Sequence, residues 1–257
     1  GLDWGSDNGD TLKVSDVNYT FPLGGWTVAV GDSMDASKTW PNACAVNNMV
    51  DNLGDCGAAN SVDLSGDVSL SASTEFGDGW ELGLGISADS GETSRGIFTN
   101  EGDDYYGIAI GYERDTFGFT AAYSMKEKTD LGANKTFEAT DTQTDSTYYG
   151  LVGYYSPESA PVTFSGGVEL TDVEGTDTDK TQWTIGVSTD LGEGTLAATV
   201  GTDGAIADNA EERMAYDVSY EYPINDSMSI TPFAYIVEQS GSTDDTAGFG
   251  ASVSFSF

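Results

Sequence analysis

Hydrophobic and polar residues alternate along most of the chain. In the last segment, Phe, Ala, Val, Phe and Phe occupy positions 249, 251, 253, 255 and 257, with Gly or Ser between them. The segment from Met214 to Tyr222 alternates in the same way, with Met, Tyr or Val at every even position. Because successive side chains of a β-strand point to opposite faces, this period of two predicts strands with one apolar face and one small or polar face.

The alternation predicts about thirteen strands. Most are ten residues or longer, whereas strands of soluble sheets usually have about five or six residues. A tilted strand of about ten residues can cross a bilayer. The chain has no apolar run of the roughly 18 residues that a membrane-spanning helix needs. The predicted strands cover residues 12–23, 25–32, 61–76, 80–90, 103–114, 117–129, 146–157, 161–174, 180–192, 194–204, 212–224, 228–239 and 245–257.

The connections between these strands alternate between short turns and longer acidic loops, the longest of which covers residues 32–60. Outer-membrane barrels have short turns at the periplasmic end and long loops outside the cell. Aromatic residues gather beside the short turns, where an interfacial girdle is expected. We therefore predict an all-β protein, an antiparallel up-and-down transmembrane β-barrel of the outer membrane, in contact with its lipid. The aromatic residues are Phe21, Trp26, Phe76, Trp80, Phe117, Tyr155, Tyr222 and Phe257.

Thirteen strands do not close a barrel of this kind. Barrels in bacterial outer membranes have even strand numbers, and an open sheet edge is not tolerated in lipid. We therefore expect residues 1–257 to form a single barrel domain that lacks strands at its N-terminal end.

The charge of the chain excludes several functions. Asp and Glu number 43 against 9 Lys and Arg, and the net charge is −34. A nucleic-acid partner is excluded, because so few basic residues cannot neutralise phosphates. Barrel enzymes of the outer membrane use histidine as a base or as its partner, and the chain contains no histidine. We expect no catalysis and no catalytic residues.

The two cysteines, Cys44 and Cys56, lie in the longest connection among small and polar residues. This arrangement favours a local disulfide in an oxidising compartment. Metal binding is the alternative, but two thiolates without a histidine make a poor site. We predict no metal site and no cofactor, apart from loose association of Ca²⁺ or Mg²⁺ with the carboxylates of 141–145, 172–180 and 242–246.

Four segments carry a family resemblance. They are VNYTFPLGGWTVAVGD (17–32), NACAVNNMVDNLGDCG (42–57), GIFTNEGDDYYGIAIGYERDTFGFTAAY (96–123) and the C-terminal segment 222–257. They resemble the porins of cyanobacteria, especially of marine picocyanobacteria, which are related to the carbohydrate-selective porins. The resemblance implies a homotrimer of 16-stranded barrels, with about three more strands upstream and, in some members, a preceding region that contacts peptidoglycan.

The resemblance also implies a function. A porin is a water-filled channel for passive diffusion of small hydrophilic solutes, carbohydrates among them, and inorganic ions. The alternative is a structural or adhesive outer-membrane barrel with a plugged lumen, acting as a surface contact or phage receptor. The many Gly, Ser and Thr residues at the polar strand positions favour an open pore.

Two sets of residues are candidates for the pore. In a 16-strand count, the connection 32–60 becomes the third extracellular loop, which folds into the lumen of trimeric porins and narrows it. Its candidates for the constriction are Asp32, Asp35, Lys38, Asp51 and Asp55, unless it is a surface loop with solvated charges. Carboxylates at polar strand positions are expected to line the pore and to favour cations. They are Asp63, Asp67, Glu75, Glu81, Glu113, Glu169, Asp217 and Glu221.

Overall fold

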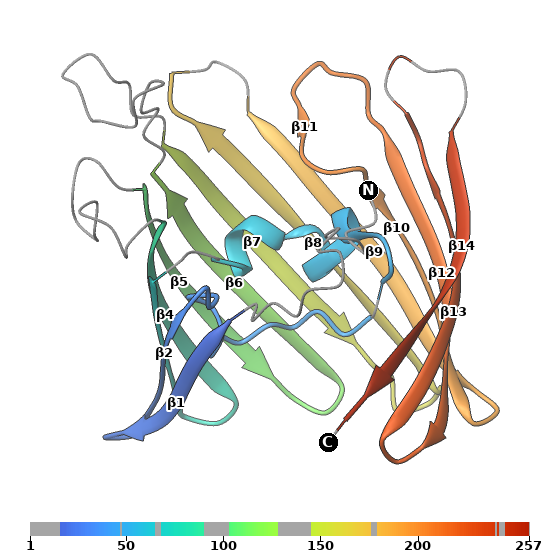
Figure 1. The fold of residues 1–257 in the computed structure, drawn as a ribbon, viewed down its shortest axis with the longest axis horizontal. Helices are drawn as coiled ribbons and strands as arrows, with labels where there is room; N and C mark the ends of the chain where they lie inside the picture. Colours follow the sequence, from blue (N-terminus) through green and yellow to red (C-terminus); the bar gives the residue numbers. More distant parts are fainter. Residues whose placement is uncertain are drawn as a thin grey trace, which may run out of the picture.

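The strands of the protein form one continuous antiparallel sheet (Figure 1). The computed structural model describes residues 16–46, 48–64, 68–89, 103–127, 145–175, 179–239, 241 and 245–256. The strands are β1 (Val17–Leu23), β2 (Trp26–Asp32), β3 (Val68–Phe76), β4 (Trp80–Asp89), β5 (Asp103–Glu113), β6 (Phe117–Lys126), β7 (Ser146–Tyr155), β8 (Val162–Val173), β9 (Lys180–Leu191), β10 (Gly194–Thr202), β11 (Ile206–Ala207), β12 (Met214–Asn225), β13 (Met228–Val237) and β14 (Thr246–Phe255). Each strand from β1 to β9 pairs with the next, β10 pairs with β12, and the path continues through β13 to β14.

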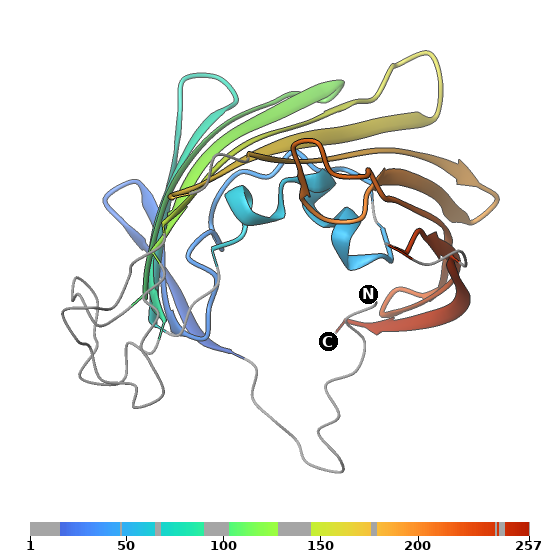
Figure 2. The same ribbon diagram turned by 90° about the horizontal axis from the view of Figure 1, so that it is seen from above.

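Seen from above, the sheet curves into a wall that wraps around two short helices (Figure 2). These helices, η1 (Asp51–Gly57) and α1 (Ala59–Val62), lie between β2 and β3 in the chain. The path of strands confirms the predicted up-and-down antiparallel barrel. Among the described strands, β11 alone was not predicted: it has two residues and pairs with β9 outside the main path.

The pairing register gives the wall two chemically different faces. Ser71 pairs with Gly85 and Leu70 with Ile86, so small residues share one face and apolar residues share the other. Ser71 on the inner face is fully buried, whereas Leu70 on the outer face is 43% exposed. This distribution suits a barrel in lipid, where the apolar face points outward to the acyl chains.

The chain between β2 and β3 runs along the inner face of the wall. We call residues 33–64 the inner loop, with an outgoing limb (33–50) and a return limb (51–64). Thr39 N–H of the outgoing limb donates to Ser71 Oγ at 3.1 Å. Ser124 Oγ of β6 donates to the carbonyl of Asn60 in the return limb at 2.8 Å. The predicted loop of residues 32–60 therefore lies inside the barrel, and it is longer than predicted.

One predicted strand begins later than expected. The alternation of 61–76 suggested a strand over this whole range, but β3 begins at Val68, and Ala59–Val62 form α1. Val62 and Leu64 are 6% and 0% exposed and belong to the apolar core between loop and wall. The pattern misled because alternating apolar residues can also be buried beneath a loop that lies against a sheet.

Aromatic side chains gather on the outer face beside the short turns, as predicted. The ring centroids of Phe76 and Trp80 are 6.3 Å apart, and those of Trp80 and Tyr112 are 4.9 Å apart. Phe257, the last residue of the predicted girdle, lies outside the described residues. Among the described residues, no helix has the length and hydrophobicity that a membrane-spanning helix requires.

Candidate functional site

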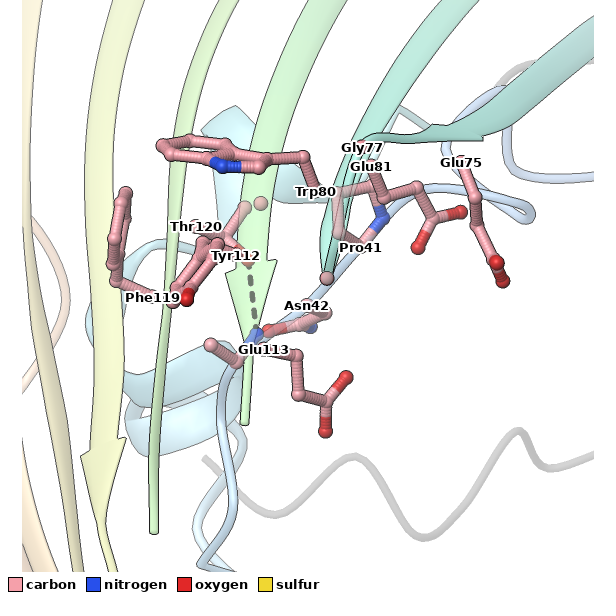
Figure 3. A pocket seen from close by; sticks show the side chains of 13 residues that line it. Pro41, Asn42, Glu75, Gly77, Trp80, Glu81, Tyr112, Glu113, Phe119 and Thr120 are labelled. Atoms are coloured by element: carbon pink, nitrogen blue, oxygen red, sulfur yellow. Dashed lines mark hydrogen bonds between the residues drawn. The ribbon is translucent and has the colours of Figure 1, made fainter. Parts of the chain in front are cut away.

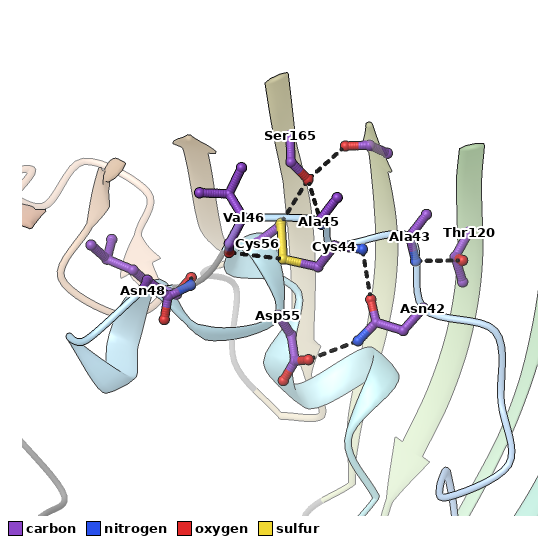
Figure 4. The surroundings of a disulfide bond; sticks show 12 residues. Asn42, Ala43, Cys44, Ala45, Val46, Asn48, Asp55, Cys56, Thr120 and Ser165 are labelled. Carbon is purple, nitrogen blue, oxygen red and sulfur yellow. Dashed lines mark hydrogen bonds between the residues drawn. A yellow bond between two sulfur atoms is a disulfide. The ribbon is translucent and has the colours of Figure 1, made fainter. Parts of the chain in front are cut away.

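A disulfide joins the two limbs of the inner loop (Figure 4). It links Cys44 to Cys56, as predicted from the sequence. Beside it, Asn42 Nδ2 donates to Asp55 Oδ1 at 2.8 Å, which ties the limbs together a second time. The backbone at Asp55 and Cys56 is left-handed, with φ of 48° and 54°. We call the segment that Cys44 and Cys56 enclose the tip of the loop. The disulfide and the hydrogen bond beside it constrain the tip independently of its contacts with the wall.

Two wall carboxylates hold this loop. The Oε1 and Oε2 atoms of Glu169 accept hydrogen bonds from Asn60 Nδ2 at 2.9 Å and from Ser61 N–H at 2.7 Å. Asp217 Oδ2 accepts from the N–H groups of Met49 at 2.6 Å and Val50 at 3.1 Å. Glu169 and Asp217 are 0% and 5% exposed. The sequence correctly placed both residues on the inner face, but the loop covers them, so the prediction that they line the open pore is corrected.

The constriction candidates separate into three groups. Asp35, Lys38 and Asp51 are exposed on the inner loop, and Asp55 is half-buried within it. Asp32 does not belong with them, because it pairs with Val68 and so shares the outward face of the wall. This corrects the prediction for Asp32: the alternation of β2 continues to its last residue and turns that side chain away from the lumen.

Asp63 lies in the return limb instead of in a strand, close to other charges. Burial raises the pKa of Asp63 to about 6, and the neighbouring carboxylates of Asp35 and Asp55 add to this rise. Lys126 of β6 acts in the opposite direction. Its Nζ lies 3.5 Å from Asn60 Oδ1. Asp67, the remaining predicted wall residue of this region, lies outside the described residues.

The raised pKa of Asp63 makes the stability of the folded protein dependent on pH. The folded protein binds the carboxyl proton of Asp63 more tightly than the unfolded chain does. The stabilisation from this bound proton is therefore complete below about pH 3.8 and is lost as the pH rises through about 6. Asp63→Asn mimics the protonated state. We expect this variant to unfold at higher temperature than the wild type near pH 8 and at the same temperature near pH 4, measured by thermal unfolding at both values. An equal difference at both pH values would contradict this account.

Three carboxylates share a cavity on the periplasmic side of the inner loop. Glu75, Glu81 and Glu113 line a cavity of about 210 Å³ with Pro41 and Asn42 of the outgoing limb. Figure 3 shows the three carboxylates on the opposite side of the sheet from the ring of Trp80. Glu75 and Glu81 are direct cross-strand neighbours, an arrangement of like charges that destabilises a sheet.

Arg114, the basic residue nearest in sequence to Glu113, does not neutralise the three carboxylates of this cavity. Arg114 turns to the neighbouring hairpin, where its Nη1 donates to Asp78 Oδ1 at 3.0 Å and its Nη2 to the Asp78 carbonyl at 2.7 Å. Glu221 lines a second cavity of about 60 Å³ with Ala45 and Met49 of the outgoing limb. The exposed inner carboxylates of the described strands are therefore concentrated on the periplasmic side of the inner loop, which we refer to as below the loop.

A family model described as Gram-negative porin matches residues 108–257, more than half of the chain. The chain belongs to this family. The porin is therefore an outer-membrane β-barrel, and its inner loop lies inside the channel region of the barrel. A search of curated proteins finds no match.

Solved outer-membrane barrels share the fold of this porin. OmpT of Vibrio cholerae, expressed in the outer membrane, is 10% identical with a TM-score of 0.66, over 95% of this chain and 81% of that one. A mutant of Rh. blastica porin is 17% identical with a TM-score of 0.61, over 98% and 80%. An anion-selective porin from Comamonas acidovorans is 13% identical with a TM-score of 0.59, over 92% and 85%. At these identities the likeness concerns the fold alone.

Sequence reasoning missed Lys126 as a charge on the inner face. Its ammonium group lies over the rings of Tyr105 and Tyr148, 5.8 and 5.4 Å from their centroids. The signal was present, because Lys126 continues the alternation of Thr120 and Ser124 on the polar face of β6. The partners of Lys126 in the loop and on β7 could not be read from that pattern. Among the described residues, no group of three or more potential ligands is placed to hold a metal ion.

Proposed function

We propose that this porin is a water-filled channel for passive diffusion of small hydrophilic solutes and inorganic ions, with a preference for cations. The observation that carries the proposal is the group of inner carboxylates below the loop. Glu75, Glu113 and Glu221 are exposed and Glu81 is half-buried. On this side of the loop, the inner face of the described strands carries no Lys or Arg.

The physical basis is electrostatic. Rings of carboxylates in a pore attract cations and repel anions, and the effect extends about 10 Å at 0.1 M salt but only about 3 Å at 1 M. Covered carboxylates such as Glu169 contribute less, because the loop separates them from the permeating ions. The anion-selective porin from Comamonas acidovorans has the same fold, so the side chains, not the architecture, must set the selectivity.

The inner loop is the proposed constriction, which limits the size of the solute. Its exposed charges Asp35, Lys38 and Asp51, together with Asp55, are the residues that a solute would pass. Small carbohydrates are within the proposed solute class, and a homotrimer in the lipid of the outer membrane is the proposed assembly. We propose no catalytic role and no cofactor, with loose association of Ca²⁺ or Mg²⁺ at the acidic extracellular loops. An adhesive barrel would need a plugged lumen, and no observation favours one.

Removing the exposed inner charges is expected to lower the cation preference. In a planar bilayer with a KCl gradient, the wild type should give a reversal potential of the sign expected for K⁺ permeation. The triple variant Glu75→Gln, Glu81→Gln, Glu113→Gln should reduce the ratio of K⁺ to Cl⁻ permeability by at least about two-fold at 0.1 M salt, and by less at 1 M.

The matched control removes three charges at the same end of the barrel but outside the lumen. Asp115, Glu158 and Asp226 are exposed in periplasmic turns, and their amide variants should leave the permeability ratio unchanged. A wild type without cation preference would refute the proposed selectivity. A folded barrel that inserts without conducting would refute the channel itself and favour the adhesive barrel.

A further inference from the structure

The tip of the inner loop reaches the far wall of the described sheet. Its attachment there includes an apolar contact, in which Val50 and Leu53 pack against Ala215 of β12 and Val237 of β13. It also includes a polar contact, in which Asp217 of β12 accepts two backbone N–H groups of the tip. The base of the loop is held by the chain itself, through β2 and β3, whereas its tip depends on noncovalent contacts of this kind.

A third contact attaches the tip to a different part of the wall. The carbonyl of Asn52 accepts a hydrogen bond from Gln182 Nε2 of β9 at 2.7 Å, and Asn52 Nδ2 donates to Asp203 Oδ1 at 2.5 Å. This contact lies beside β9 and the end of β10, so it leaves the hold on β12 to Asp217 and the apolar side chains. Among the described residues, the outgoing limb of the tip is therefore fixed to β12 by the side chain of one polar residue, Asp217.

We propose that Asp217 is a positioning residue of the channel, a latch that holds the tip of the inner loop against the wall and so keeps the lumen open. The inference rests on the proposed channel function. It concerns the geometry of hydrogen bonding, not the charge of the lumen. Asp217 is 5% exposed, so its carboxylate does not meet the permeating ions.

Both hydrogen bonds end on the same oxygen of Asp217, so this latch can be distinguished experimentally from a contact that needs both carboxylate oxygens. The N–H groups of Met49 and Val50 donate to Oδ2. The amide oxygen of an asparagine can accept both, while its NH₂ group would replace Oδ1, which among the described residues is buried without a hydrogen-bond partner near Thr199, the direct cross-strand neighbour of Asp217 on β10. Thr199 carries a hydroxyl that can accept from this amide. The latch therefore needs one acceptor oxygen and tolerates the loss of the charge.

The second anchor, Glu169, differs in this respect. It uses both oxygens, one for Asn60 Nδ2 and the other for Ser61 N–H. A glutamine at this position can accept only one of these hydrogen bonds, because its NH₂ group is a donor. Two carboxylates that look equivalent in the sequence should therefore respond differently to the same change from acid to amide.

The disulfide determines how much of the loop moves when the hydrogen bonds to Asp217 are lost. Cys44 and Cys56 enclose the tip, including the residues that Asp217 holds. The limbs cannot separate at this point, so the tip moves as one body. On β12 and β13, the apolar contacts of Val50 and Leu53 then remain as the other hold in the described part of the chain. Release of the latch should thus appear as movement of the whole tip.

The test compares Asp217→Ala with Asp217→Asn in the full chain. Asp217→Ala should raise the fraction of time in closed or partly closed states by at least about ten-fold in single-channel recordings, because it leaves the N–H groups of Met49 and Val50 without their acceptor, and an unsatisfied buried donor is costly. It should also accelerate amide hydrogen exchange across residues 45–55. Asp217→Asn should match the wild type in closures, in exchange and in the ratio of K⁺ to Cl⁻ permeability. Glu169→Gln, which loses one of its two hydrogen bonds to Asn60 and Ser61, should accelerate exchange at residues 58–62 relative to the wild type.

Three results would overturn the proposal. Wild-type exchange and gating in Asp217→Ala would mean that the apolar contacts and Asn52 are sufficient to hold the tip. Equal defects in Asp217→Asn and Asp217→Ala would mean that the charge, not the acceptor, is required. A changed permeability ratio in Asp217→Asn would mean that the carboxylate reaches the lumen. Exchange can be measured in a folded barrel that does not conduct, so failure of the channel function and failure of the latch are separate outcomes.

Discussion

Gly85→Ala is expected to push the inner loop away from the wall and to lower the free energy of unfolding by about 1–3 kcal/mol, the usual cost of overpacking a filled core. A Cβ atom at this position would meet the carbonyl oxygen of Ala36, and would lie 2.9 Å from Ala36 C and from Trp40 Cζ2. The first obstacle is backbone, which cannot rotate away as a side chain can. The loop must therefore move into the lumen, which should reduce single-channel conductance.

The control for this variant lies in the loop itself. A Cβ at Gly54 would have nothing within 4 Å, and the φ of Gly54 is −56°, which alanine adopts readily. Gly54→Ala should therefore leave conductance and unfolding unchanged, which separates a steric effect from a general sensitivity of the loop. If Gly85→Ala conducts like the wild type and unfolds at the same temperature, the loop does not rest on this glycine in the membrane.

Gly85 is one of a series of inner-face glycines on which the loop rests. At Gly107 a Cβ would collide with Trp40 and Leu64, and at Gly150 with Ser61. Glycine at these strand positions weakens a sheet, but it allows the loop backbone to approach the wall closely. The abundance of glycine at polar strand positions therefore has a steric explanation in addition to the openness of the pore that the sequence suggested.

Removing the disulfide is expected to release the tip of the loop while the barrel stays folded. In the chain-entropy model, a closed loop of this length contributes about 3 kcal/mol. Asp55 and Cys56 are two successive non-glycine residues in the left-handed region, a conformation that costs about 1–3 kcal/mol per residue. Without the covalent link, this backbone should relax, and residues 51–58 should exchange their amide hydrogens much faster in the double variant Cys44→Ser, Cys56→Ser.

Reduction of the wild type provides an independent form of the same experiment. A reductant should reproduce the faster exchange in the wild type and should have no effect on the double serine variant. Strand content, measured by circular dichroism, should be the same in all samples, because the backbone hydrogen bonds between the strands do not involve the disulfide. Unchanged exchange of residues 51–58 after complete reduction would show that the contacts with the wall are sufficient to hold the tip.

The sequence by itself determined the architecture of this protein. Alternation places each side chain on one of two faces, and it does so locally, within a few residues, so the strands, their antiparallel order and the inward position of Glu75, Glu113 and Glu221 could all be read before any contact was known. The pairing of Cys44 with Cys56 was also predictable, because the chain contains two cysteines and they lie in one short polar segment.

Only the tertiary structure decided which inner residues meet the lumen. Glu169 and Asp217 satisfy the same alternation as Glu113, but the inner loop covers them, and Asp217 is separated by 168 residues from Met49, whose N–H it accepts. No local pattern records such a contact. The same reason explains Val62 and Leu64, whose alternation resembles a strand although they are buried between loop and wall. The face of the sheet that a side chain occupies is set locally by the backbone, whereas the exposure of that side chain depends on whether a distant segment covers the face.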